Sequence, residues 1–448
     1  MSEVKRVKPQ NPKGTRDFLP AEVAKRNYLF GIIKSVFAKY GFEQIETPAM
    51  ERLETLTGKY GEEGDNLLFK ILNSGDFLKD APAAELADRN SKGLTKHIAE
   101  KGLRYDLTVP LARFVVQHQD KIAFPFKRYH LGPVWRADRP QKGRYQEFYQ
   151  CDADIIGSTS LLNEVELTCI FVEVFKTLGI NATVRINSRK VLEAIAIAQQ
   201  AQEQFAAITV AVDKFDKIGL EGVGNELAKL GLSEVQQKGL LQTLTVKSTA
   251  DLAALIGSTD MGKAGLAEVD FVMQKCGATN VKFDVTLARG LNYYTGVIWE
   301  VVCDYVKIGS IASGGRYDNL TELFGGQNMS GVGISFGVER IFDIMEELNL
   351  FPAGVQNSAK ILFVPRETAV EDFAFGLVQQ VRAAGLAAEI FLGNVKKQKQ
   401  YGYAEQKGIL FISEVGGDEM TGGLLRVKNT QTREEQRVDI QSLIALLK

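Results

Sequence analysis

The chain has 448 residues, a length that corresponds to about two to four domains of ordinary size. Hydrophobic residues make up 45% and charged residues 24%, which is typical of a globular protein and excludes a disordered chain, a coiled coil and a collagen-like fibre. The 54 basic and 55 acidic residues leave a net charge of −1, so a globally basic nucleic-acid coat protein is excluded, although a local basic site is not.

The sequence shows no sign of membrane insertion or secretion. No apolar run approaches the roughly 18 residues of a membrane helix, and the N-terminus has no apolar signal region. The four cysteines are scattered without a Cys-x-x-Cys pair, and the three histidines show no ligand spacing with them, so we expect no zinc site. In a long cytoplasmic protein, few and scattered cysteines predict reduced thiols.

Residues 1–187 and 279–350 are predicted to form one antiparallel-sheet domain of an α+β fold. Alternating, β-branched or aromatic runs with Gly and Pro between them predict strands. The expected strands cover residues 42–48, 103–110, 126–136, 144–156, 293–302 and 331–337. Helices are expected at residues 21–41 and 338–348.

Residues 188–278 are predicted to be a helical insertion in this domain. Asn187 or Ser188 can cap the first helix, whose apolar residues recur at helical spacing. The Pro/Gly/Asn/Ser stretch at 351–359 is expected to be a linker.

Residues 360–448 are predicted to form a parallel α/β domain. Strands are expected at 361–365, 387–392 and 409–413, with a helix ending at Gly385 and a Lys-rich helix at 396–407 between them. The domain has 12 basic and 11 acidic residues, so its charge does not predict RNA binding. Its clustered lysines suit phosphate contacts, with a solvated helix face as the alternative.

The segment 127–154 has a high density of positive charge. Between Lys127 and Glu147 there are six basic and two acidic residues, a net charge of +4. Pro140 and Gly143 predict a turn between two strands, flanked by arginines that can bind phosphate oxygens through two parallel hydrogen bonds. Each such bond is worth ~1.5–3 kcal/mol, so two or three would anchor a triphosphate. A solvated hairpin tip explains this stretch equally well.

The segment 287–300 combines an arginine with two tyrosines. Arg289 precedes a glycine, and Tyr293 and Tyr294 lead into an expected strand, where only one of them can face a given pocket. An arginine buried near a pocket needs an anionic partner. Taken alone, the segment favours an interpretation in which the tyrosines pack on a sheet face and Arg289 lies in solvent.

The segment 331–345 predicts a strand followed by a helix, with Arg340 in the first helical turn. A cation there opposes the helix dipole, which makes sense if an anion binds at the helix start. The glycine spacing does not fit a dinucleotide fingerprint, and the chain has no P-loop.

Two polar pairs are predicted to share strand faces. Asp106 and Thr108 lie two residues apart, and a carboxylate beside a hydroxyl suits an ammonium group. Gln150 and Asp154 form the second pair. For each pair, an ordinary solvent-facing position is the alternative.

Taken in order over nearly the whole chain, these segments resemble the class II histidyl-tRNA synthetases. PKGTRDFLP (12–20) resembles the opening signature of the family, and the helix from Ala21 with the strand ending at Pro48 resembles motif 1, the dimer element. Residues 134–150 resemble motif 2 and residues 331–340 motif 3. LARGLNYYTG (287–296) and SGGRYD (313–318) resemble the two histidine-specific signatures, and residues 360–448 resemble an anticodon-binding domain.

The resemblance implies roles at the ATP site. Arg136 and Arg340 would hold the α- and γ-phosphates, and Arg144 would help from the hairpin. Phe148 would stack on adenine, with Asp138 in the same site. Arg289 would stabilise the α-phosphate during attack by the substrate carboxylate. The resemblance thus makes Arg289 and Arg136 the catalytic residues.

The resemblance also implies a histidine site. Asp106, Thr108 and Gln150 would hold the α-amino group, whereas Asp154 and Tyr294 would hydrogen-bond the imidazole nitrogens. Tyr293 and Tyr317 would lie nearby. Many family members have Glu at the positions of Asp106 and Asp154, and Asp at the position of Asn292, where this chain lacks the charge.

The implied activity is ATP- and Mg²⁺-dependent activation of L-histidine, followed by transfer to the 3′ end of tRNA(His) by a cytoplasmic homodimer. The helical insertion would contact tRNA. One alternative is a non-catalytic paralogue, either a regulatory subunit of histidine biosynthesis or a tRNA-sensing domain. The arginines at 136, 289 and 340 and the full C-terminal unit argue against it. Another class II synthetase is opposed by the two histidine-specific signatures.

Overall fold

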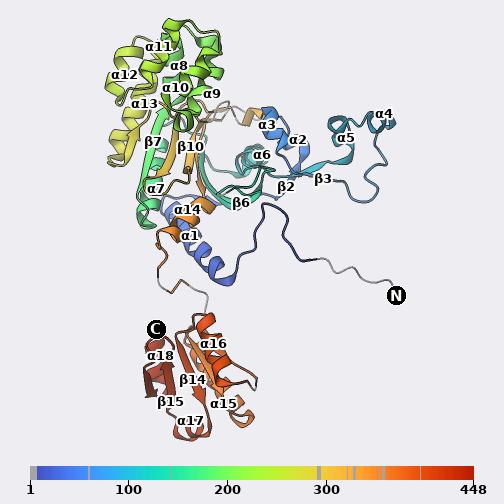
Figure 1. Cartoon of the computed structure of the whole chain (residues 1–448), viewed down its shortest axis with the longest axis vertical. Helices are drawn as coiled ribbons and strands as arrows, with labels where there is room; N and C mark the ends of the chain where they lie inside the picture. The colour runs from blue at the N-terminus through green and yellow to red at the C-terminus, as the bar shows by residue number, and fades with distance from the viewer. Residues whose placement is uncertain are drawn as a thin grey trace. The chain divides into compact units, whose positions relative to one another are not determined.

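The computed structural model describes residues 8–58, 61–141, 143–289, 294–319, 321–325, 329–352, 354–355, 359–393 and 395–448. The chain divides into two compact units, one of residues 1–17 and 29–350 and one of residues 18–28 and 351–448 (Figure 1). The helical insertion lies within the first unit, so its status as a separate domain stays a prediction. Within the described parts of the chain, no helix combines the length and apolar character that crossing a membrane requires.

An eight-stranded sheet forms the centre of the first unit, in the order β1-β5-β6-β11-β10-β9-β7-β8. Neighbouring strands from β5 to β7 pair antiparallel, whereas the outermost strands β1 and β8 pair parallel. This confirms the predicted antiparallel sheet. The strands are β1 (Glu43–Gln44), β5 (Phe126–Trp135), β6 (Glu147–Ile156), β7 (Ala182–Ser188), β8 (Val281–Phe283), β9 (Val297–Cys303), β10 (Ser310–Tyr317) and β11 (Gly331–Gly337).

Helices α1 (Pro20–Lys39) and α7 (Leu162–Thr177) supply aromatic side chains to one face of this sheet. The ring of Phe336 in β11 lies 5.9 Å from that of Phe37 in α1 and 5.4 Å from that of Phe171 in α7. Because side chains alternate along a strand, Ser335 and Gly337 face the other way. Ser335 lines the cavities on that opposite face, which is where the candidate site lies.

The insertion between β7 and β8 is helical, as predicted, and Figure 1 shows its helices gathered into one bundle. Ser188 is the N-cap of the first helix and accepts a hydrogen bond from the backbone N–H of Lys190, whereas Asn187 donates to carbonyl oxygens instead. A shared core of Val, Leu, Ile and Ala side chains holds the bundle together. Its helices are α8 (Arg189–Ala198), α9 (Phe205–Asp213), α10 (Phe215–Ala228), α11 (Glu234–Thr243), α12 (Thr249–Ile256) and α13 (Asp260–Cys276).

A smaller sheet of order β2-β4-β3 and short helices complete the first unit. The strand expected at 103–110 is wrong, because β4 ends at Leu103 and a helix begins at Thr108. Asp106 Oδ1 accepts the backbone N–H groups of Thr108 and Val109, which starts the helix. The elements are β2 (Met50–Arg52), β3 (Lys70–Ile71), β4 (Lys101–Leu103), α2 (Leu53–Leu56), α3 (Gly61–Asn66), α4 (Ala83–Ala87), α5 (Ser91–Ile98), α6 (Thr108–His118) and α14 (Val338–Glu347).

Two other expected strands are shorter in the structure. Only Glu43 and Gln44 of the run at 42–48 form a strand. The run at 293–302 becomes a strand only from Val297, so Tyr294 precedes β9 rather than lying in it. Tyr293, with Asn292, lies outside the described residues.

The second unit contains a five-stranded sheet of order β13-β12-β14-β15-β16. The first three strands are parallel, as predicted, but β15 and β16 add an antiparallel edge that the sequence pattern did not reveal. Gly385 follows the end of its helix at φ +80°, as a helix terminator should. The elements are β12 (Ile361–Pro365), α15 (Glu371–Ala383), β13 (Ala388–Ile390), α16 (Lys397–Gln406), β14 (Phe411–Val415), α17 (Gly417–Gly422), β15 (Leu425–Asn429), β16 (Glu435–Val438) and α18 (Ile440–Leu447).

Candidate active site

The floor of the candidate site is the open face of β6, β11 and β10. The strand register places Asp152 opposite Ser335, and Asp154 opposite Gly333. Small residues in β11 leave room above the acids: a Cβ atom at Gly333 would lie 1.9 Å from Oδ1 of Asp154. At Gly315 of β10 an added Cβ would lie 2.7 Å from the ring of Tyr294. Polar side chains next to glycines therefore create a hollow in the sheet face.

Four arginines converge on one cavity above this floor, which we call the cationic cleft. They come from the β5–β6 loop, from the segment after β8 and from the first turn of α14. All the residues expected at the ATP site line it, together with Arg289: Arg136, Asp138, Arg144, Phe148, Arg289 and Arg340. Segments that are far apart in the sequence thus meet at one cavity.

Arg340 is oriented by neutral partners. Its Nη1 donates to the carbonyl oxygen of Ser310 at 2.6 Å, and its Nε donates to that of Gly143 at 3.3 Å. Burial, and then the nearby charges of Arg144 and Arg289, lower the pKa of Arg340. These arginines repel one another, so a polyanion in the cleft would be held strongly.

Arg136 lines both the cationic cleft and the pocket next to it. Its Nε donates to the carbonyl oxygen of Tyr105 at 3.0 Å, and its guanidinium lies 4.2 Å from the ring centre of Tyr105 and 5.2 Å from that of Phe148. The side chain is thus held between two rings with its charge available to a ligand. At the loop, Arg144 lies 3.7 Å from a carboxylate oxygen of Asp138.

Arg289 is held by a carboxylate that the sequence analysis missed. Its Nη2 lies 2.6 Å from Oε1 of Glu300 in β9, and the same carboxylate lies 3.7 Å from Arg185. Burial raises the pKa of Glu300, against the charges of the two arginines. The side chain of Arg289 is half-exposed, but it forms an ion pair with Glu300. The segment alone had favoured an arginine that lies in solvent.

The opening signature also contacts this region. The carbonyl oxygen of Gly14 accepts the backbone N–H of Gln146 at 2.8 Å, and Arg16 donates to the hydroxyl of Tyr145 at 2.9 Å. Arg16 also forms an ion pair with Glu339, the residue before Arg340. The N-terminal segment therefore links the β5–β6 loop to the start of α14.

A second cavity adjoins the cationic cleft and is lined by three carboxylates; we call it the acidic pocket. The two cavities share Arg136, Gln150, Ser313 and Ser335. All the residues expected at the histidine site line the acidic pocket, except Tyr293, which is outside the described residues: Asp106, Thr108, Gln150, Asp154, Tyr294 and Tyr317. Asp106 and Thr108 reach it from the start of α6 rather than from a strand.

Asp154 is fixed from two sides. Its Oδ1 accepts a hydrogen bond from the hydroxyl of Tyr317, and its Oδ2 lies 2.6 Å from Nη2 of Arg128, a residue with no exposed surface. Burial raises the pKa of Asp154, against Arg128 and the Tyr317 hydroxyl. The geometry keeps this carboxylate in one orientation.

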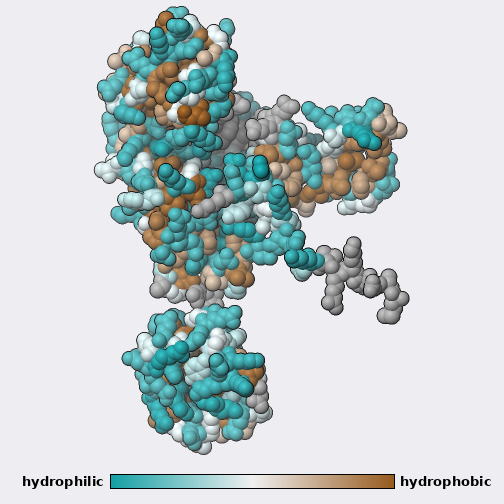
Figure 2. Space-filling view, in the orientation of Figure 1, coloured by the Kyte–Doolittle hydropathy of each residue, from teal (hydrophilic) through white to brown (hydrophobic). Residues whose placement is uncertain are grey.

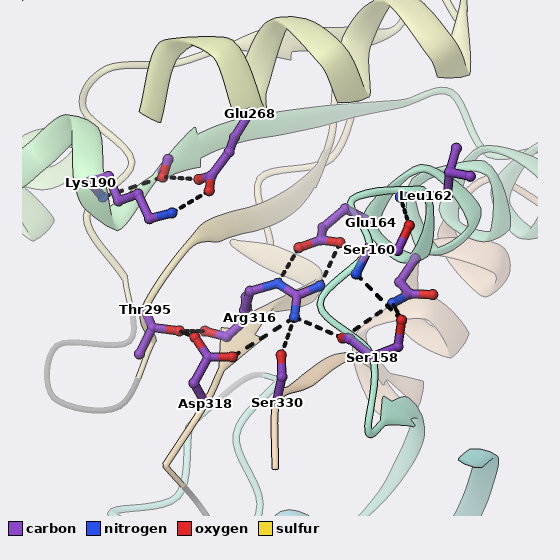
Figure 3. Close-up of polar contacts among 12 residues, drawn as sticks. Ser158, Ser160, Leu162, Glu164, Lys190, Glu268, Thr295, Arg316, Asp318 and Ser330 are labelled. Carbon is purple, nitrogen blue, oxygen red and sulfur yellow. Dashed lines mark hydrogen bonds and ion pairs between the residues drawn. The ribbon is translucent and has the colours of Figure 1, made fainter. Parts of the chain in front are cut away.

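Arg316 anchors the strand that carries Tyr317. Figure 3 shows its guanidinium facing the carboxylate of Glu164, with Nε and Nη2 donating to the two oxygens at 2.5 and 2.8 Å. Nη1 donates to the carbonyl oxygen of Ser158 at 3.1 Å and to the hydroxyl of Ser330. Because neighbouring residues point to opposite faces, this buried pair holds β10 while Tyr317 faces the acidic pocket.

The lysine cluster of α16 is partly neutralised. Lys397 lies 2.6 Å from Glu414, and Lys407 forms an ion pair with Glu389. Lys396 and Lys399 are exposed. Phosphate contacts by this helix therefore stay a prediction.

Comparisons with known proteins agree with this geometry. A family model described as histidyl-tRNA synthetase matches residues 14–78 and 96–341, and one described as an anticodon binding domain matches residues 359–448. The histidine–tRNA ligase of Bacteroides fragilis is 51% identical over 450 residues, covering 98% of this chain and 99% of its own length. That of Phocaeicola vulgatus is 50% identical, covering 99% of each chain.

A solved structure has the same fold. The crystal structure of histidyl-tRNA synthetase from Nostoc sp. PCC 7120 matches with a TM-score of 0.83 and 28% identity, covering 99% of each chain. Sequence relatives and structure neighbour thus agree over the full length. The chain belongs to the histidyl-tRNA synthetase family.

Proposed function

We propose that the protein is a histidine–tRNA ligase, which activates L-histidine with ATP and transfers the histidyl group to the 3′ end of tRNA(His). The observation that carries this proposal is the contact between the cationic cleft and the acidic pocket, which share Arg136 and Gln150. The cleft suits a triphosphate and the pocket suits a substrate with an ammonium group and an imidazole. The shared wall is where the two reactants would meet.

In the activation step, the histidine carboxylate attacks the α-phosphorus and expels pyrophosphate. Both reactants are anions, so fixed positive charge is the main catalytic requirement. Arg136 and Arg289 bind the α-phosphate and stabilise the negative charge that develops there in the transition state. Arg340 and Arg144 hold the outer phosphates, and Phe148 stacks on adenine.

Mg²⁺ fits the donor set of the cationic cleft. The carboxylates of Asp138 and Glu339 line the cleft, and Mg²⁺ is commonly bound by one or two carboxylates together with substrate phosphates. When bound, it would neutralise β- and γ-phosphate oxygens. The absence of a zinc site stays a prediction.

Histidine recognition rests on buried polar groups. Asp154 and Tyr294 hydrogen-bond the two imidazole nitrogens. The α-ammonium is bound by Asp106, Thr108 and Gln150. Tyr317 holds Asp154 in place, and Tyr293 is proposed to lie nearby. A site of this kind rejects amino acids that lack the matching groups by roughly 10⁴–10⁵, because its own polar groups would be left unpaired.

The second step uses the activated histidyl group. A ribose hydroxyl of the terminal adenosine of tRNA attacks its carbonyl carbon and releases AMP. In this proposal residues 360–448 bind the anticodon, and the helical insertion at 188–278 contacts the tRNA. The catalytic core is residues 1–187 with 279–350, joined to the C-terminal domain by the linker 351–359.

A homodimer is the proposed assembly. Figure 2 shows apolar side chains gathered on the segment that carries β3, α4 and α5. Leu72, Phe77, Leu78 and Leu86 there are 38–51% exposed. A surface of this kind suits burial against a second copy. The proposed location is the cytoplasm, and all four cysteines are free thiols, as in a reducing compartment.

The test is histidine-dependent exchange of pyrophosphate into ATP without tRNA, followed by charging of tRNA(His). We expect exchange with histidine and not with other amino acids. Folded protein that binds tRNA but catalyses no exchange would contradict the ligase and favour a regulatory paralogue. The solution mass, from light scattering, checks the dimer.

A further inference from the structure

Asp152 is a third carboxylate in the floor of the acidic pocket, and the proposed histidine contacts do not use it. It lies on β6 between Gln150 and Asp154, and the alternation of the strand puts all three on one face. All three line the acidic pocket. Asp152 is only 3% exposed.

Three oxygens in this row have no hydrogen-bond partner among the described residues, and one of them, Oδ2 of Asp154, lies 2.6 Å from Nη2 of Arg128. The other two are Oδ1 of Asp152 and Oε1 of Gln150, and no positive side chain in the described part of the chain pairs with either of them. Gln150 uses its amide nitrogen to donate to the hydroxyl of Ser335 at 3.2 Å. A buried hydrogen-bond acceptor without a donor costs free energy of folding. A pocket that retains two such acceptors therefore suits a ligand that donates N–H groups to them.

We propose that Asp152 is a further specificity-determining residue, whose Oδ1 accepts a hydrogen bond from the α-ammonium of the amino-acid substrate beside Oε1 of Gln150. The inference rests on the proposed function and deepens it. It adds a contact that the family resemblance did not assign.

The charges around Asp152 favour an ammonium rather than the imidazole as its partner. Asp106 and Asp154 face it and repel its negative charge, and Arg128 and Ser335 partly offset this. Arg128 contacts Asp154 directly, so the positive charge of Arg128 is largely taken by that carboxylate. His130 lies opposite Asp152 in the register, and burial with the charges of Arg128 and Arg104 lowers its pKa to about 3, so it is neutral.

A bound cation would therefore ionise Asp152. Burial, and then the charge of Asp154, raise the pKa of Asp152 to about 7. An ammonium group at Oδ1 stabilises the carboxylate and lowers that pKa, so binding near pH 7 releases a proton to solvent. Binding of the ammonium consequently strengthens as the pH rises through 7.

Two analogues isolate the ammonium contact. Histidinol keeps the α-ammonium and the imidazole, whereas imidazole-propanol is the same alcohol without the amino group and keeps only the imidazole. In calorimetry at pH 7, in buffers of different ionisation enthalpy, we expect the wild-type protein to release more protons on binding histidinol than on binding imidazole-propanol. Equal release would overturn the proposal without any variant.

The variant is Asp152→Asn, which preserves the shape and removes the charge. We expect the histidine KM in pyrophosphate exchange to rise roughly 10- to 100-fold with the ATP KM unchanged, as befits a lost charged hydrogen bond. Histidinol affinity should fall by a similar factor and imidazole-propanol affinity should not. Asp304→Asn, at an exposed position after β9, is the matched control.

Unchanged histidine KM in Asp152→Asn would overturn the proposal, as would equal weakening of both analogues. Thermal unfolding checks that the variant is folded. If it is not, the proton-release comparison on the wild type decides. Failure of the proposed function is distinguishable, because the wild-type protein would then catalyse no histidine-dependent exchange.

Discussion

Nη2 of Arg289 lies 2.6 Å from Oε1 of Glu300, and this carboxylate comes from a buried position in β9. The pair joins a half-exposed loop arginine to the rigid centre of the sheet. The ion pair orients the positive charge of Arg289 toward the cationic cleft while the arginine stays accessible to solvent. Such a position suits a side chain that binds a phosphate entering from solvent.

Replacing Arg289 tests its role in chemistry. We expect Arg289→Ala to lower kcat of the activation step by roughly 10²–10³, the usual cost of removing one donor that stabilises transition-state charge. The ATP KM should change much less. Steady-state pyrophosphate exchange with varied ATP separates the two parameters. A large rise in ATP KM at unchanged kcat would make Arg289 a binding residue only.

Glu300 is expected to be a positioning residue. Glu300→Gln keeps the size of the side chain but weakens its hold on Arg289, so we expect kcat to fall roughly 10- to 100-fold, the cost of misplacing a reacting group. Because Glu300 acts through Arg289, the double variant should be no slower than Arg289→Ala. Additive losses in pyrophosphate exchange would show that the carboxylate acts by another route.

Gly333 is expected to be essential for the space beside Asp154. An added Cβ would lie 1.9 Å from the Asp154 carboxylate, so Gly333→Ala should raise the histidine KM and lower stability by about 1–3 kcal/mol, the usual cost of overpacking. The ATP KM should stay near its wild-type value. The matched control is Gly31→Ala in α1, where nothing lies within 4 Å of the added atom. Histidine kinetics like those of the control would contradict the proposed pocket.

The ionisation of Asp152 predicts a pH dependence of stability. Its pKa is raised to about 7 in the folded protein from an ordinary value of 3.8. Between these two values the native state keeps a proton that the unfolded chain loses. The contribution of Asp152 to the free energy of unfolding therefore falls as the pH rises from about 4 to 7. Asp152→Asn should flatten that decline, as measured by thermal unfolding across the range. An unchanged slope would show that Asp152 is ionised throughout it.

Part of the site was predictable because its residues act through local patterns. Alternation along β6 placed Gln150 and Asp154 on one face, and the strand–helix transition placed Arg340 in a first helical turn. The same alternation includes Asp152, so a signal for it was present and was overlooked. Asp106 reached the predicted pocket from a different element, because its carboxylate caps a helix start instead of lying in a strand.

Other features had no local signal. In the sequence, Glu300 is a single polar residue within an apolar strand. No neighbouring residue indicates that it pairs with Arg185 of β7 as well as with Arg289. The buried pair of Arg316 and Glu164 joins residues 152 positions apart. The antiparallel edge of β15 and β16 depends on sheet pairing in the same way.

The amino-acid sequence by itself determined the order of the strands and helices in most of the chain, the charged loop and the family to which the residues point, because these depend on spacing along a few turns or strands. The tertiary structure decided which charges meet: the four arginines at one cleft, the three carboxylates at the next, and the buried partners that hold Arg289 and Asp154. The physical reason is that Coulomb attraction and desolvation depend on distance and burial in space, and chain separation specifies neither.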